Sequence, residues 1–119
     1  MSELRLLLWL ATDVREEVAA QLADCVVIGE CGCGCSSVQL ATSAAPLPAR
    51  TIGRLSAQGR LDYVSLSSTG RDPTGHRVDL VLHVVGGRLH ELEIFDPEAG
   101  EGTAVDPDQL VSLDRPEIG

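Results

Sequence analysis

The residues best suited to chemistry are Cys31, Cys33 and Cys35, which alternate with two glycines in a Cys-Gly-Cys-Gly-Cys segment. Their thiolates suit a soft or borderline ion such as zinc or Cu(I), and the glycines allow the backbone to bend until the thiolates converge. A structural zinc site normally takes four protein ligands. Cys25 is a poor fourth ligand because an extended chain places it about 20 Å from the cluster.

Three histidines, His76, His83 and His90, are the other possible sources of a fourth ligand. Two further interpretations of the cysteines stay open: a disulfide or redox pair, or small apolar side chains that only pack at a tight turn. Residues 19–49 contain no Lys or Arg that would lower the pKa of a thiol. The alternative function is therefore a metal-binding or thiol-redox module centred on the three cysteines.

The strongest charge feature is the acidic C-terminal quarter. Residues 91–119 hold nine acids and one Arg, a net charge of −8 out of −9 for the chain. The candidate binding residues are Glu91, Glu93, Asp96, Glu98, Glu101, Asp106 and Asp108. Acidic surfaces speed association with basic partners and repel the phosphates of nucleic acids. We therefore expect a non-enzymatic interaction module, an inhibitor or immunity-type binder of a basic protein, and no nucleic-acid partner.

Catalytic signals are weak by comparison. Glu91 and Glu93 share a strand face, but alternating acids are typical of any solvated strand. The acids after residue 95 lack the ligand spacing of an EF-hand. Phosphate-binding, dinucleotide-binding and hydrolase motifs are absent from the sequence, so no nucleophile can be paired with a base.

Length and composition predict one cytoplasmic domain. The 119 residues, 44% of them hydrophobic, suffice for a single core. No apolar run reaches the roughly 20 residues that span a bilayer. The run Leu6–Ala11 is followed by charged residues and not by a signal-peptide cleavage site. Three clustered cysteines cannot staple distant segments, which is typical of a reducing compartment and not of a secreted protein.

The N-terminal segment predicts a helix that packs through one apolar face. Its apolar residues recur at spacings of three and four: Leu4, Leu7, Leu8, Ala11, Val14, Val18 and Leu22. Thr12 and Asp13 interrupt the pattern, and Asp13 with Glu16 resembles a capping box. We expect either a bent helix or a short first turn followed by a helix over 13–24.

Short β-branched runs predict the first strands. Residues 25–30 and 36–42 should form a hairpin with the cysteines at its tip. Residues 43–59 contain two prolines and are expected to be a loop or an irregular crossing. A third strand over 61–67 and a turn over 69–75 should follow.

The segment 75–95 predicts a second hairpin, whose turn sets its register. A two-residue Gly86-Gly87 turn would place Leu82 opposite Glu91 and His83 opposite His90. A three-residue loop that begins at Val85 pairs apolar residues instead, such as Leu80 with Leu92 and Val78 with Ile94. We expect the three-residue loop, which places His83 and His90 on opposite faces.

Two segments carry a family resemblance: residues 31–40, Cys-Gly-Cys-Gly-Cys-Ser-Ser-Val-Gln-Leu, and residues 87–95, Gly-Arg-Leu-His-Glu-Leu-Glu-Ile-Phe. They resemble a small uncharacterised family of bacterial proteins from high-GC genomes, in which a helix leads into a C-G-C-G-C tip and a later hairpin reads G-R-L-x-x-L-E-V-Y. Gln39 and Phe95 depart from that pattern, where the family often has an acid and a Tyr. The resemblance implies this order of elements and no activity.

Together these patterns predict an α+β fold, with the N-terminal helix packed on an antiparallel sheet of about four to five strands and a turn-rich acidic segment over 97–119. The expected core residues are Leu7, Leu8, Val18, Leu22, Ile28, Val38, Leu80, Leu82, Leu92 and Ile94.

Overall fold

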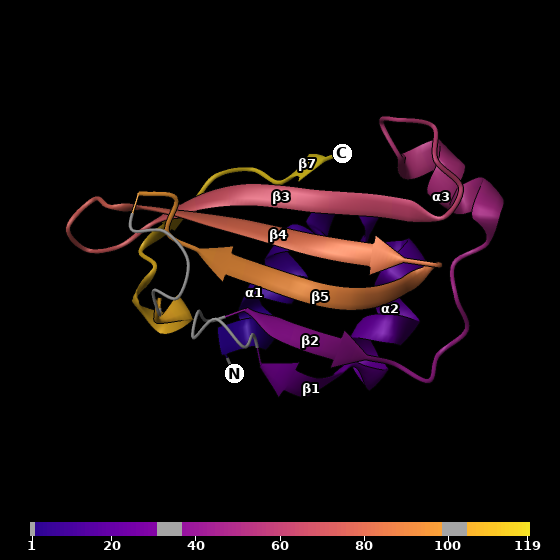
Figure 1. Cartoon of the computed structure of the whole chain (residues 1–119), viewed down its shortest axis with the longest axis horizontal. Helices are drawn as coiled ribbons and strands as arrows, with labels where there is room; N and C mark the ends of the chain where they lie inside the picture. The colour runs from indigo at the N-terminus through magenta and orange to yellow at the C-terminus, as the bar shows by residue number, and fades with distance from the viewer. Residues whose placement is uncertain (1, 31–36, 99–104) are drawn as a thin grey trace.

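The computed structural model describes residues 2–30, 37–98 and 105–119, and they form an α+β fold (Figure 1). The helical segments are α1 (Ser2–Leu10), η1 (Thr12–Val14), α2 (Arg15–Asp24), α3 (Ala49–Leu55) and η2 (Pro107–Gln109). The strands are β1 (Val26–Glu30), β2 (Val38–Ala41), β3 (Tyr63–Arg71), β4 (Arg77–Val85), β5 (Arg88–Phe95), β6 (Ser112–Leu113) and β7 (Glu117–Ile118). The predicted fold class is confirmed.

The strands make one antiparallel sheet with the order β1-β2-β5-β4-β3-β6, and β7 also pairs with β3. The described residues form seven strands, more than the four to five predicted, because the C-terminal segment adds two strands of two residues each. Figure 1 shows α1 and α2 behind the sheet, on one of its two faces. The other face, towards the viewer, is not covered by α1 or α2, and we call it the uncovered face.

The N-terminal helix is bent, as one of the two alternatives predicted. It breaks between Leu10 and Arg15, where η1 inserts a tighter turn. The predicted capping box is wrong: the residue that caps α2 is Val14, and no side chain caps the helix there.

The buried face of α1 includes only part of the predicted apolar stripe. Leu6 and Leu10 are fully buried, whereas Leu4 and Leu8 are 37% and 39% exposed. On an α-helix Leu8 lies about 160° around the axis from both Leu6 and Leu10, so it faces away from the side that these two residues bury. The prediction that Leu8 belongs to the core is therefore wrong.

The core lies between the helices and the alternating inward side chains of the strands. Eight of the ten expected core residues are buried: Leu7, Val18, Leu22, Val38, Leu80, Leu82, Leu92 and Ile94. The prediction that Ile28 belongs to the core is wrong, because this residue is 63% exposed. It belongs to the edge strand β1, where a β-bulge between Val27 and Gly29 interrupts the alternation.

The segment between the two hairpins is not the predicted loop, because it contains α3. The helix starts after Pro48, whose carbonyl accepts hydrogen bonds from the N–H groups of Thr51 and Ile52. Ile52 is 1% exposed and anchors the helix to the core. A seven-residue helix with one buried side chain leaves little periodicity in the sequence.

Strand β3 runs to Arg71, four residues further than predicted, because it pairs with β4 along its whole length. The connecting turn is correspondingly short. Asp72 organises it by accepting hydrogen bonds through Oδ1 from the N–H groups of Thr74 and His76, at 2.9 Å each.

The β4–β5 turn is the two-residue Gly86-Gly87 turn, so the predicted three-residue loop is wrong. Both glycines have positive φ, 60° and 84°, as a type I′ turn requires. A bulge around His90 then shifts the register, and His83 lies opposite Glu91 with the apolar residues still paired on the core face.

Hydrogen bonds from α2 and from the segment that precedes α3 hold the β4–β5 turn in place. Gln21, 1% exposed, donates to the Gly87 carbonyl at 2.7 Å and accepts from the N–H of Leu89 at 2.9 Å. The N–H of Leu47 also donates to the Gly87 carbonyl, at 2.8 Å. None of these three hydrogen bonds can be predicted from the sequence around the turn.

Within the described part of the chain, no helix is both long enough and apolar enough to cross a bilayer.

Candidate metal centre

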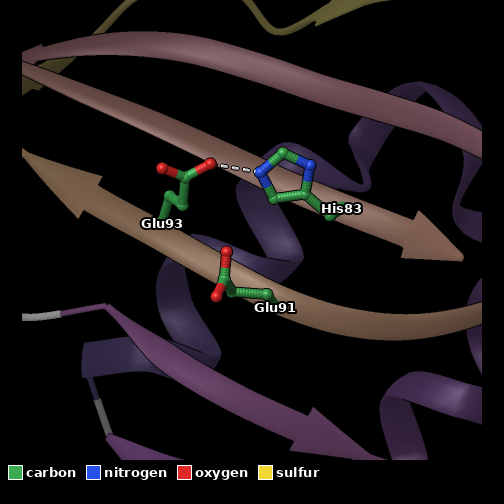
Figure 2. A group of neighbouring side chains, drawn as sticks. All are labelled: His83, Glu91 and Glu93. Carbon is green, nitrogen blue, oxygen red and sulfur yellow. Dashed lines mark hydrogen bonds and ion pairs between the residues drawn. The ribbon is translucent and has the colours of Figure 1, made fainter. Parts of the chain in front are cut away.

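Three side chains that can bind a metal ion meet on the uncovered face of the sheet: His83 from β4, and Glu91 and Glu93 from β5 (Figure 2). The bulge places Glu91 directly opposite His83. Glu93 lies two residues further along β5, where strand alternation returns its side chain to the same face. Two adjacent strands therefore supply all three groups.

The ligand atoms of these residues converge. One nitrogen of His83 and one carboxylate oxygen from each glutamate all lie within 4.8 Å of one another. Nε2 of His83 is hydrogen-bonded to Oε1 of Glu93. The side chains of His83 and Glu93 are 21% and 37% exposed, so an ion from solvent can reach the cluster.

A neighbouring tyrosine holds the imidazole from its other side. The hydroxyl of Tyr63, on β3, lies 2.5 Å from Nδ1 of His83. The Arg60 guanidinium in turn lies 5.1 Å from the centre of the Tyr63 ring, within the range of a cation–π contact. Both ring nitrogens of His83 thus have partners, which restricts rotation of the ring.

The predicted cysteine cluster lies outside the described residues, as does Glu101. Cys25 is a free thiol of intermediate burial. Desolvation and the nearby Asp24 carboxylate both raise the pKa of Cys25 above its ordinary value. Cys25 is therefore protonated at neutral pH and is a poor nucleophile.

The predicted acidic residues do not gather in one place. Asp96 is 8% exposed, with Oδ2 2.5 Å from Nε2 of His76 and Oδ1 accepting from the N–H of Glu98 at 2.8 Å. Glu98 is also 3.8 Å from Nδ1 of His76. Asp96 therefore holds the chain as it leaves β5.

Asp106 and Asp108 lie in a third location, at η2. Asp106 accepts a hydrogen bond from the N–H of Asp108 at 2.9 Å and so caps this short helix. Arg5 of α1 donates to the carbonyl of Pro107, which places η2 beside α1. Of the predicted acids, only Glu91 and Glu93 join a cluster of metal-binding side chains within the described residues.

Neither the pairing of His83 with these glutamates nor the role of Tyr63 is predicted from the sequence. The Gly86-Gly87 dipeptide was a signal for the two-residue turn. This dipeptide alone does not predict the cluster, because a two-residue turn without the bulge pairs His83 with His90. Beside the bulge, the N–H of Leu89 donates to the buried Gln21 of α2, a contact between distant segments that local sequence patterns do not reveal.

No family model, curated protein sequence or solved structure matches this chain.

Proposed function

We propose that the protein binds a divalent transition-metal ion on the uncovered face of its sheet, through His83, Glu91 and Glu93. The observation that carries the proposal is the convergence of one imidazole and two carboxylates within 4.8 Å. This corresponds to the alternative function predicted from sequence, with a different set of ligands from the cysteines.

Coordination requires a specific tautomer of His83. A neutral imidazole that binds an ion through Nε2 carries its proton on Nδ1. That N–H then donates to the Tyr63 hydroxyl oxygen, which lies at hydrogen-bond distance. A partner of this kind fixes the ring and makes the coordinating nitrogen more basic.

The ligand types favour zinc or manganese over Cu(I). Imidazole suits zinc and carboxylates suit manganese, whereas Cu(I) prefers soft thiolates. Zinc is normally four-coordinate, so three protein ligands leave one position for water or for a group from another molecule. This open position is typical of sites that act on, or recognise, a bound group.

Isothermal titration calorimetry with zinc chloride tests the proposal. Wild-type protein should bind one ion, and His83→Gln should weaken the affinity by about tenfold or more, because it removes the nitrogen ligand. His90→Gln is the matched control, since His90 is an exposed histidine on the same hairpin. Equal affinity for wild type and both variants would sink the proposal.

The cysteine site remains a separate proposal, and the same titration distinguishes it. If Cys31, Cys33 and Cys35 bind the ion, the triple Ser variant loses binding and His83→Gln does not. If His83 and the glutamates bind it, the outcome is reversed.

Docking of acidic residues on a basic protein is the second candidate function. The net charge of −9 supports it. Removing residues 97–119 is an unsuitable test, because Leu110 belongs to the core and β6 and β7 pair with β3. Charge-neutral variants of the exposed Glu98 and Asp108 are better, and they should weaken binding to the basic test protein cytochrome c mainly at low salt.

The cytoplasm is the proposed site of action, and fractionation of cells tests it.

A further inference from the structure

Strand β1 lies at an edge of the sheet. Among the described strands it pairs only with β2, through the register Val26↔Ala41 to Glu30↔Val38. Its outer side therefore presents backbone N–H and C=O groups to which another strand can bind.

The side chains of this edge are unusually apolar for their exposure. Val26, Val27 and Ile28 follow one another and are 57%, 50% and 63% exposed. Proteins normally protect such edges with charged residues or proline. Among the described residues of β1, the bulge before Gly29 and the charge of Glu30 are the features that protect this edge.

The apolar surface continues from β1 onto α1. A hollow of about 260 Å³ lies between them, lined by Leu4 and Leu7 from the helix and by Cys25, Val27 and Leu40 from the strands and the residue before them. Contiguous apolar surface of this kind marks interaction sites more often than isolated exposed side chains do.

Three acidic residues lie at or next to this surface. Glu3 is the one charged residue among the described residues that line the hollow, Asp24 precedes β1 and Glu30 ends it. A hydrogen bond from Ser43 lowers the pKa of Asp24, which keeps it ionised at neutral pH. In an antiparallel pair of two copies, Glu30 of one chain would approach Asp24 of the other. The charges therefore favour a basic partner over a second copy.

We propose that the β1 edge binds an extended segment of a partner protein as an added strand, in which apolar side chains alternate and Lys or Arg residues flank them. Backbone hydrogen bonds supply the pairing, the hollow takes an apolar side chain, and the acids select the basic flanks. This inference is independent of the proposed metal site.

Peptide binding followed by NMR tests the proposal. The probe is the synthetic peptide Arg-Val-Thr-Val-Thr-Val-Arg, titrated into ¹⁵N-labelled protein. Amide signals of residues 26–30 should shift. Methylation of alternate peptide nitrogens, which removes the donors for strand pairing, should weaken binding by about tenfold or more, and so should Glu in place of both Arg.

Two matched variants locate the surface. Ile28→Lys places a repulsive charge on the edge and should abolish the shifts. Val111→Lys changes another exposed apolar residue, 67% exposed, in the segment that precedes β6, and should leave binding unchanged. Thermal unfolding of both variants reports whether each is folded.

Three results would overturn the proposal. In the first, the methylated or Glu-flanked peptide binds as tightly as the basic one. In the second, the shifts lie away from β1 or are absent. In the third, sedimentation shows a stable dimer that Ile28→Lys dissociates, which would identify a second copy as the occupant.

Discussion

Tyr63 determines how His83 presents its metal-binding nitrogen. The tyrosine hydroxyl is the partner of Nδ1 and leaves Nε2 directed towards Glu93. Without that hydroxyl the imidazole can rotate or adopt the other tautomer, and part of the binding free energy then goes into restoring its orientation.

Tyr63→Phe is therefore predicted to lower zinc affinity by about tenfold. The variant keeps the ring beneath Arg60, so the free energy of unfolding should fall by only about 1 kcal/mol, the net value of one hydrogen bond. Calorimetric titration and urea unfolding measure the two quantities. An unchanged zinc affinity would show that the hydroxyl does not position His83.

At the scale of elements, the β4–β5 hairpin joins the fold to the site. Its two-residue turn and bulge bring His83 opposite Glu91. The turn depends on Gly87, where an added Cβ would lie 2.6 Å from the carbonyl oxygen of Leu47. Gly86 also has a positive φ, but a Cβ added there would have no neighbour within 4 Å.

Gly87→Ala should destabilise the protein much more than Gly86→Ala. Both variants carry the cost of a left-handed residue, about 1–2 kcal/mol, and only Gly87→Ala adds a clash with backbone. We expect a difference of about 2 kcal/mol or more in the free energy of unfolding, measured with urea. Equal destabilisation would contradict the close contact with Leu47.

Asp24 joins the end of α2 to the segment after β2. Its Oδ2 accepts hydrogen bonds from the hydroxyls of Thr42 and Ser43 at 3.0 and 2.8 Å. These bonds lower the pKa of Asp24, those from Ser43 most strongly. Because the folded state has the lower pKa, its stabilisation is complete above the unfolded value of about 3.9 and is lost as the pH falls through the folded value.

Asp24→Asn should therefore destabilise the protein at neutral pH, and the difference from wild type should shrink under acidic conditions. Urea midpoints of both proteins, measured as a function of pH, give this difference. A difference that stays constant from neutral to strongly acidic pH would argue against an ionised Asp24 as the acceptor.

Local patterns predicted most elements of this fold but not the contacts between them. The sequence pattern predicts the alternation of β4 and the bend at Thr12 and Asp13. The bulge near His90 and the exposure of Ile28 have no such local signal: the first lies beside a hydrogen bond to Gln21 of α2, and the second reflects the edge position of β1. The metal cluster was missed for the same reason, because its residues meet only after the register shifts.

At the scale of the whole molecule, the acids serve different purposes in different places. Asp96 and Asp106 hold turns, whereas Glu91 and Glu93 lie together on the uncovered face. Bringing two carboxylates close to one histidine concentrates negative charge, which a bound cation offsets. Metal binding and folding stability should therefore be coupled.

Free manganese at about 100 times its dissociation constant should raise the free energy of unfolding by about 2.7 kcal/mol, if the unfolded chain does not bind it. Urea unfolding with and without manganese measures the gain. His83→Gln at the same ion concentration should gain much less. A gain that is equal in wild type and variant would place the ion elsewhere.

Cobalt(II) spectroscopy is the decisive measurement for the metal site, because the absorption spectrum reports the ligand atoms. We expect one equivalent of Co²⁺ with d–d bands and no thiolate charge-transfer band, retained in His90→Gln and lost in His83→Gln. A thiolate charge-transfer band that persists in His83→Gln and disappears in the triple Cys→Ser variant would contradict the proposed site and assign the ion to Cys31, Cys33 and Cys35.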